Sequence, residues 1–216
     1  MCVIAVSPKG IRQPSEAELR EMWENNPHGG GYMLVRKGRV EIHKGFMEWT
    51  DFIRSVRSER LSASDPCVYH FRISTQGGIN AEMTHPFPVT NNLKIMKALD
   101  VACDIGIAHN GIIPLTSSID ETEYSDTALF VSHYLSWLVR SPSDMMNPNI
   151  RKMIAELGQS KFALMDYKGN ISTIGAFYNE DGILLSNRNH LFNYDYCYYG
   201  KGEDRKCIAF LKGKFA

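Results

Sequence analysis

The chain begins MCVIAVSPKG (residues 1–10), a short apolar run that ends in turn-forming residues. Cys2–Val6 has the length and apolar character of a buried β-strand, and Ser7-Pro8-Lys9-Gly10 predicts the turn that ends it. Only Met1 precedes Cys2, and methionine aminopeptidases generally remove Met before a residue as small as cysteine. We expect this cleavage, which would leave Cys2 at the head of the first strand.

An amino-terminal cysteine carries a nucleophile and a base on one residue. The reference pKa of an α-amine is about 7.7 and that of a thiol about 8.5, so a neutral amine can accept the thiol proton near physiological pH. A separate histidine is then not needed to activate the sulfur. The position of Cys2 therefore predicts a nucleophile, although a cysteine can also occur near a chain start by chance.

The composition is that of an ordinary globular protein. The 216 residues are 44% hydrophobic and 22% charged, and the formal net charge is zero. This balance gives no reason to expect binding to nucleic acid or a membrane surface, and no apolar run approaches the ~20 residues of a membrane span. The amino terminus does not resemble a signal peptide. We expect a single domain over 1–216 without a cofactor.

The five cysteines indicate the compartment. They are Cys2, Cys67, Cys103, Cys197 and Cys207, an odd number without the paired spacing of a metal site. Such usage suits a reducing cytoplasm, so the sequence predicts a cytoplasmic protein with no metal centre.

Hydrophobic periodicity predicts alternating strands and helices. Helices are expected after a Ser15–Glu18 capping box, after an N-cap at Thr50, over 126–139 and over 147–158. Strands are expected at residues 2–6, 32–36, 40–44, 67–74, 105–108, 162–165, 171–174 and 182–185. This order favours layered sheets with helices outside.

Polar clusters follow several of the expected strands. In the strand 67–74, alternation places His70 and Arg72 on one face, and a planar guanidinium suits bidentate binding of a carboxylate. His109-Asn110-Gly111 follows the apolar strand 105–108, where it is either a common turn or a pair of oxyanion donors. Ser125-Asp126-Thr127 opens a helix, where it is either an N-cap or a carboxylate for an ammonium group.

Five motifs in one order resemble class II glutamine amidotransferases, which are N-terminal nucleophile (Ntn) hydrolases. The motifs are Met1-Cys2, His70-Phe71-Arg72-Ile73-Ser74-Thr75-Gln76-Gly77, His85-Pro86-Phe87, His109-Asn110-Gly111 and Ser125-Asp126-Thr127. The resemblance is strongest over residues 1 to about 130. It implies an α+β fold, the four-layer αββα Ntn sandwich of two mainly antiparallel sheets.

The resemblance also implies roles for these residues in hydrolysis of the side-chain amide of L-glutamine. Cys2 attacks the amide, its own α-amine is the base, and the resulting thioester is hydrolysed to glutamate after ammonia leaves. The other roles, with every position numbered in this chain, are oxyanion stabilisation by Asn110 and Gly111, α-carboxylate binding by Arg72, α-ammonium binding by Asp126, and pocket shaping by Thr75, Gly77 and His85.

Two departures from the family pattern affect what can be expected. The loop that usually reads Asn-Arg-Gly-x-Asp-Gly is here Asn25-Asn26-Pro27-His28-Gly29-Gly30-Gly31, so glycines are kept while an arginine and an aspartate are missing. Familiar members also fuse this domain to a synthase that consumes the ammonia. We therefore expect either a separate synthase or acceptor-binding partner, or a glutaminase that acts alone.

Three alternatives remain open at this stage. A metal hydrolase using Cys2, His70, His85 and His109 is disfavoured because these residues lack the spacing of metal ligands. A non-catalytic interaction protein could retain the glutaminase fold. A relative acting on another amide is the third alternative, and the pairing of Arg72 with Asp126 as an amino-acid clamp favours glutamine over it.

Overall fold

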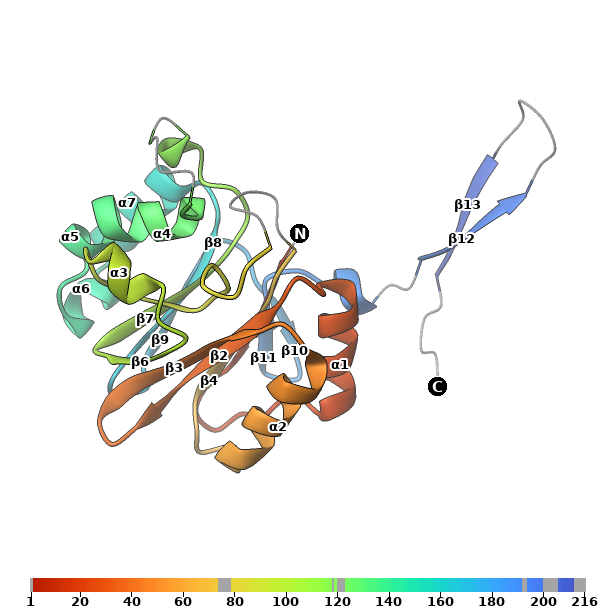
Figure 1. The fold of residues 1–216 in the computed structure, drawn as a ribbon, viewed down its shortest axis with the longest axis horizontal. Helices are drawn as coiled ribbons and strands as arrows, with labels where there is room; N and C mark the ends of the chain where they lie inside the picture. Colours follow the sequence, from red (N-terminus) through yellow and green to blue (C-terminus); the bar gives the residue numbers. More distant parts are fainter. Residues whose placement is uncertain are drawn as a thin grey trace.

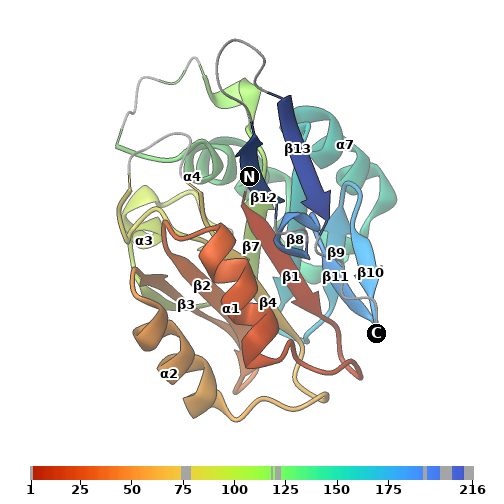
Figure 2. The same cartoon turned by 90° about the vertical axis from the view of Figure 1, so that its right-hand side faces the viewer.

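Two large antiparallel sheets form the centre of the fold (Figures 1 and 2). The computed structural model describes residues 2–73, 79–117, 119, 123–191, 194–199 and 206–211, the last two ranges by their backbone alone. The first sheet has seven strands in the order β10 (Tyr178–Glu180), β11 (Ile183–Leu185), β1 (Val3–Ser7), β4 (Cys67–Phe71), β2 (Gly30–Arg36), β3 (Arg39–Phe46) and β6 (Asp100–Cys103). The second sheet has four strands in the order β5 (Phe87–Pro88), β7 (Ile105–Asn110), β8 (Lys161–Asp166) and β9 (Ile171–Ile174).

Helices cover the outer face of each sheet. The seven-stranded sheet is covered by α1 (Glu16–Asn25) and α2 (Trp49–Glu59), and the four-stranded sheet by the helices of residues 114–158 (Figure 1). The helices of residues 114–158 are η1 (Pro114–Thr116), α4 (Asp126–Phe130), η2 (Val131–Leu135), α5 (Ser136–Leu138), α6 (Pro142–Met146) and α7 (Pro148–Gly158). Two further short helices are α3 (Leu93–Met96) and η3 (Asn189–Leu191).

Three separate hydrophobic clusters define four layers. The first joins α1 and α2 to the seven-stranded sheet, around Trp23, Phe52 and Phe71. The second lies between the two sheets, and the third joins the four-stranded sheet to its helices, around Phe130 and Phe162. Because alternate residues of a strand point to opposite faces, an internal strand of such a sandwich is buried on both faces, as β4 is along its whole length.

The predicted fold class is confirmed. The chain is an α+β protein with a four-layer αββα arrangement, and its strand pairs are all antiparallel in the described ranges. The Ser15–Glu18 capping box is present in both directions, at 3.3 Å from Glu18 N to Ser15 Oγ and 2.6 Å from Ser15 N to Glu18 Oε2. Local signals of this kind therefore agree with the final packing.

The helix predicted over 126–139 differs in its middle. It runs from Asp126 to Leu138, but residues Val131–Leu135 form a π-helical turn. A π turn contains an extra residue and so rotates everything after it relative to a regular α-helix. Helical spacing places Trp137 on the apolar side with Phe130 and Tyr134, but in the structure, after this turn, its side chain is 58% exposed.

Two element boundaries were also predicted incorrectly. The strand expected over 67–74 ends at Phe71, because Arg72 pairs instead with the glycine loop: Arg72 N donates to Gly29 O at 2.8 Å, and His28 N donates to Arg72 O at 3.0 Å. The second helix begins at Trp49 after Glu48, so Thr50 lies inside its first turn and is not the N-cap.

A hairpin of β12 (Tyr194–Tyr199) and β13 (Lys206–Leu211) forms a third sheet of its own, drawn apart from the two larger sheets in Figure 1. Within the described part of the chain, no helix has both the length and the hydropathy needed to cross a lipid bilayer.

Candidate active site

The candidate site lies where three strand ends meet. Val3 of β1 pairs with Phe71 of β4, so Cys2 and Arg72 extend side by side from the same end of the seven-stranded sheet. His109 and Asn110 end β7 in the facing sheet. A hydrogen bond of 2.9 Å between His70 Nε2 and His109 O joins the two sheets at this end.

These strand ends enclose a narrow cavity. Its lining consists of Cys2, Arg72, Ile73, His85, His109, Gly111, Ser125, Asp126 and Thr127. The cavity volume is about 20 Å³, enough for about one water molecule. Five of the residues predicted for the site therefore lie around one cavity, namely Cys2, Arg72, His85, Gly111 and Asp126. Thr75 and Gly77 fall outside the described residues.

Cys2 is half-buried and held by backbone groups. Its thiol contacts the backbone of Ile73, with Sγ accepting from Ile73 N at 3.3 Å and lying 3.4 Å from Ile73 O. Asn187 Nδ2 donates to Cys2 O at 2.6 Å and fixes the main chain. Burial raises the pKa of the Cys2 thiol, while the Ile73 N–H and nearby positive charge, including Arg72, act in the opposite direction.

Arg72 is almost fully buried at the cavity wall, with 3% of its surface exposed. Burial lowers the pKa of Arg72, and the negative charges of Cys2 thiolate and Asp126 act against that change. The glycine loop beside Arg72 packs closely against the segment that carries Thr84 and His85. A Cβ on Gly31 would lie 2.4 Å from His85 O, and one on Gly29, where φ is +103°, would lie 2.9 Å from Thr84 Cγ2.

Asp126 is the first residue of α4, and Ser125 is its N-cap. Its Oδ2 accepts from Ile113 N at 2.9 Å, and its Oδ1 accepts from Thr127 N at 2.7 Å. These bonds fix the carboxylate in place. Oδ1 also lies 3.2 Å from Thr127 Oγ1, whereas Oδ2 has one donor and keeps a lone pair for a further donor.

The turn at Asn110-Gly111 requires glycine at its second position. Gly111 has a φ of +145°, and a Cβ there would lie 1.8 Å from Ser160 Oγ. Asn110 is buried beside the cavity and is not among its lining residues. One N–H of its amide donates to Ser186 Oγ at 2.8 Å, and the same oxygen accepts from Ile4 N at 2.9 Å. Ser186 thus ties Asn110 to the strand that carries Cys2.

Three buried histidines, His70, His85 and His109, lie close together behind these groups. The rings of His70 and His85 are 4.3 Å apart, and that of His109 lies 6.1 Å from His85. Burial lowers the pKa of His70 to about 3 and that of His109 to about 4, and it holds the pKa of His85 well below its usual value. All three are therefore neutral at physiological pH. In the described part of the chain, the hydrogen bonds of Cys2 Sγ involve Ile73 rather than a histidine.

Sequence patterns did not assign Ser160, Ser186, Asn187 or Lys44 to the site, although all four support it. Ser186 and Asn187 follow β11 and reach Asn110 and Cys2 across 76 and 185 residues, a pairing that no local signal reveals. Lys44, by contrast, had a signal. It continues the alternation of Val40 and Ile42 on the buried face of β3.

Lys44 links three elements beneath the loop that carries His85. Its Nζ donates to Glu82 O at 2.7 Å and to Met96 O at 2.6 Å, and it lies 3.8 Å from the ring centre of Phe87. Burial lowers its pKa from 10.5 to about 7, with Glu82 acting to raise it and Arg72 to lower it.

This shift predicts how stability depends on pH. Between pH 7 and 10.5 the unfolded chain keeps the Lys44 proton and the folded chain loses it, so the Lys44 contribution to stability increases as pH rises. Between pH 7 and 8.5 we expect the free energy of unfolding to rise by roughly 1.5 kcal/mol relative to Lys44→Met. Urea unfolding at several pH values measures this difference, with Lys152→Met, whose side chain is 77% exposed, as the control. Parallel pH profiles for wild type and Lys44→Met would contradict the prediction.

Among the residues that the structure describes, the cavity has neither a metal-binding group nor a second reactive cysteine. The described residues include no group of three His, Cys, Asp or Glu side chains arranged to hold a metal ion. Burial raises the pKa of Cys67 and Cys103 to about 12, which keeps both thiols protonated at physiological pH. Of the three cysteines whose side chains the structure describes, Cys2 therefore has the setting best suited to a nucleophile.

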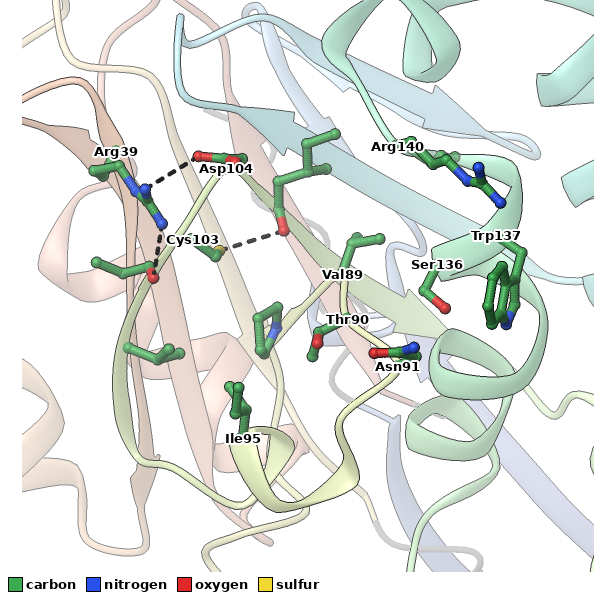
Figure 3. A pocket seen from close by; sticks show the side chains of 15 residues that line it. Arg39, Val89, Thr90, Asn91, Ile95, Cys103, Asp104, Ser136, Trp137 and Arg140 are labelled. Carbon is green, nitrogen blue, oxygen red and sulfur yellow. Dashed lines mark hydrogen bonds and ion pairs between the residues drawn. The ribbon is translucent and has the colours of Figure 1, made fainter.

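A wider groove of about 430 Å³ lies at the opposite end of β7 (Figure 3). Arg39 and Asp104 form an ion pair of 3.3 Å on one side, and Trp137 and Arg140 lie on the other. Cys103 donates to Ile105 O at 3.3 Å within it. The groove is the larger of the two, but its protonated thiol and paired charges form no catalytic arrangement, so the chemistry is assigned to the narrow cavity.

Comparisons with known proteins add little to this description. No family model and no curated protein sequence matches the chain. Among solved structures, the chain is similar to a glutamine phosphoribosylpyrophosphate amidotransferase from B. subtilis complexed with ADP and GMP, with 16% sequence identity and a TM-score of 0.44. The match covers 77% of this chain and 35% of the other, so this chain spans about a third of that protein's length.

Proposed function

We propose that this protein hydrolyses the side-chain amide of L-glutamine to glutamate and ammonia, with Cys2 as the nucleophile. One observation carries the proposal. One small cavity has around it the Cys2 thiol, the buried Arg72, the Asn110-Gly111 turn and the carboxylate of Asp126 at the N-terminus of α4. The resemblance of the sequence motifs implies the same grouping. The two histidines that line this cavity, His85 and His109, have pKa values well below the usual value because they are buried, so both are poor proton acceptors. The α-amine of Cys2, freed by removal of Met1, is therefore the base in this scheme.

The reaction then has two halves. The α-amine takes the thiol proton, and Sγ attacks the amide carbon to give a tetrahedral intermediate. Its oxyanion is stabilised by the backbone N–H of Gly111 and by the second N–H of the Asn110 amide, the first being used by Ser186. The amine returns the proton to the departing nitrogen, which leaves as ammonia. Water then attacks the thioester, and glutamate and the free thiol are regenerated.

Arg72 and Asp126 account for the choice of an amino acid as substrate. A guanidinium can form two hydrogen bonds with the α-carboxylate, and the fixed carboxylate of Asp126 can accept from the α-ammonium group. Glutamine is larger than the 20 Å³ cavity, so its binding requires the cavity to widen. We also propose that the ammonia passes to an acceptor held by a separate polypeptide.

Glutamate release from L-glutamine tests the proposal, with D-glutamine and L-asparagine as control substrates. Wild-type protein should act on L-glutamine and discriminate against both controls, since either change moves the amide relative to the clamp. Absence of glutamate release from protein whose Met1 has been removed would favour the alternative of an interaction protein that retains the fold.

Replacement of Arg72 by lysine should weaken glutamine binding although the positive charge is kept. Lysine lacks the bidentate fork, a loss of about 1–3 kcal/mol for a charge-assisted contact. The α-carboxylate changes little during the reaction, so the effect should be a raised KM with a small change in kcat. Arg54→Lys, at a side chain 77% exposed on α2, is the matched control. An unchanged KM with a collapsed kcat would show that Arg72 acts elsewhere.

A further inference from the structure

A chain of polar contacts runs behind the cavity from Asp126 to Asn110. His109 lies in its centre, with Nδ1 at 2.8 Å from Thr127 Oγ1 and Nε2 at 2.8 Å from Ser160 Oγ. On one side, Thr127 Oγ1 lies 3.2 Å from Asp126 Oδ1. On the other, Ser160 Oγ donates to Asn110 O at 3.0 Å.

The protons of this chain can be assigned by counting them. A serine hydroxyl has one proton, and Ser160 gives it to Asn110 O. Ser160 Oγ must then accept from His109, so Nε2 carries a proton. Burial lowers the pKa of His109 to about 4, so at neutral pH the ring holds only that proton. Nδ1 is therefore an acceptor.

Thr127 completes the assignment. Its hydroxyl has one proton and two neighbouring acceptors, His109 Nδ1 at 2.8 Å and Asp126 Oδ1 at 3.2 Å. Ser160, Thr127 and the neutral His109 ring together supply three protons for four contacts, so the longest contact, from Thr127 Oγ1 to Asp126 Oδ1 at 3.2 Å, is the one left without a proton. The Asp126 oxygens then accept from the backbone N–H groups of Ile113 and Thr127. The remaining lone pairs of the Asp126 carboxylate stay available to a ligand in the cavity that this residue lines.

We propose that His109 is a positioning residue, fixed as the neutral Nε2–H tautomer, that holds the oxyanion turn and the α4 carboxylate at a set separation. Its effect on catalysis rests on the proposed glutaminase function, and its tautomer does not. Packing supports this assignment. The His109 ring stacks on Phe162 with ring centres 4.9 Å apart. Ser160 Oγ lies so close to Gly111 that a Cβ at position 111 would be 1.8 Å from it, so only glycine fits there. A neutral ring suits this apolar contact.

Two variants separate the two ends of the chain. Glutamine at position 109 keeps a donor near Nε2 for Ser160, whereas asparagine keeps a polar atom near Nδ1 for Thr127. His109→Gln should raise KM about tenfold and leave kcat within about threefold, because only the substrate-clamp side is released. His109→Asn should lower kcat about tenfold with KM within about threefold, because only the oxyanion side is released.

The tautomer is measured without any activity. ¹⁵N-histidine labelling of the full chain, which has seven histidines, gives the protonation of each ring nitrogen by NMR, and His109→Gln identifies the His109 signals. Nε2 should be protonated and Nδ1 unprotonated at pH 7. A protonated Nδ1 would overturn the inference even if glutamine is hydrolysed. If both folded variants showed a lowered kcat together with a raised KM, the separate roles of the two ends would be overturned. Failure of glutamine hydrolysis with the expected tautomer would reject the proposed function alone.

Discussion

Replacement of Cys2 by alanine should reduce glutamate release from glutamine by at least about 10³-fold, since removing a covalent nucleophile leaves only binding and oxyanion stabilisation. Cys2→Ser should lose most activity as well, because a hydroxyl of high pKa is activated poorly by an α-amine. Both variants should remain folded, since Cys2 precedes β1, is not fully buried, and changes little in volume when replaced by alanine or serine. The measurement is a coupled assay of glutamate, with ammonia determined in parallel.

Cys103→Ser is the matched control for this result. Cys103 is half-buried in the wider groove and its thiol pKa is about 12, so its replacement should leave glutamate release unchanged. Equal release by wild type and Cys2→Ala would remove the nucleophile from the scheme and with it the proposed reaction.

The second large effect is expected at the oxyanion turn. Asn110→Ala should lower kcat about 10²–10³-fold with little change in KM, because the amide oxygen becomes negatively charged only as sulfur attacks. The variant should fold, since Asn110 ends β7 and its side chain interacts with Ser186 rather than filling a core. Steady-state kinetics of the purified variant measure both constants.

Two companion variants sharpen the result for Asn110. Asn149→Ala, at an exposed position of α7, should behave as wild type. Ser186→Ala removes the hydroxyl that holds the Asn110 amide and should lower kcat by a smaller factor, with the same unchanged KM. A folded Asn110→Ala protein with wild-type kcat would return His109-Asn110-Gly111 to the status of an ordinary turn.

Local sequence signals account well for the elements and less well for their interruptions. The capping box at Ser15, the turn residues and the apolar alternation of 67–71 act over a few residues and could be recognised directly. The π turn at 131–135 could not, since its extra residue is stabilised by the packing of the helix on the four-stranded sheet. The early end of β4 likewise depends on Gly29, more than forty positions earlier, which replaces strand pairing at Arg72.

The candidate site divides in the same way. Cys2, Arg72, His85, Gly111 and Asp126 belong to short motifs, and the antiparallel pairing of β1 with β4 explains why Cys2 and Arg72 meet. The groups that hold them, Ser160, Ser186 and Asn187, come from distant segments, and no local pattern predicts their contacts with the site. Thr75 and Gly77 remain predictions. Lys44 could have been predicted as a buried supporting residue, because it is a charged residue on the apolar face of β3.

The central claim is that Cys2, with its α-amine free, is the nucleophile toward glutamine. The most direct test treats the full-length protein with a glutamine analogue in which a diazoketone replaces the amide, so that the attacking sulfur becomes alkylated, followed by intact-mass and peptide mass spectrometry. We predict a chain without Met1, a single adduct on Cys2, and protection by L-glutamine but not by D-glutamine. Retention of Met1, or labelling of Cys67 or Cys103 in place of Cys2, would contradict the account.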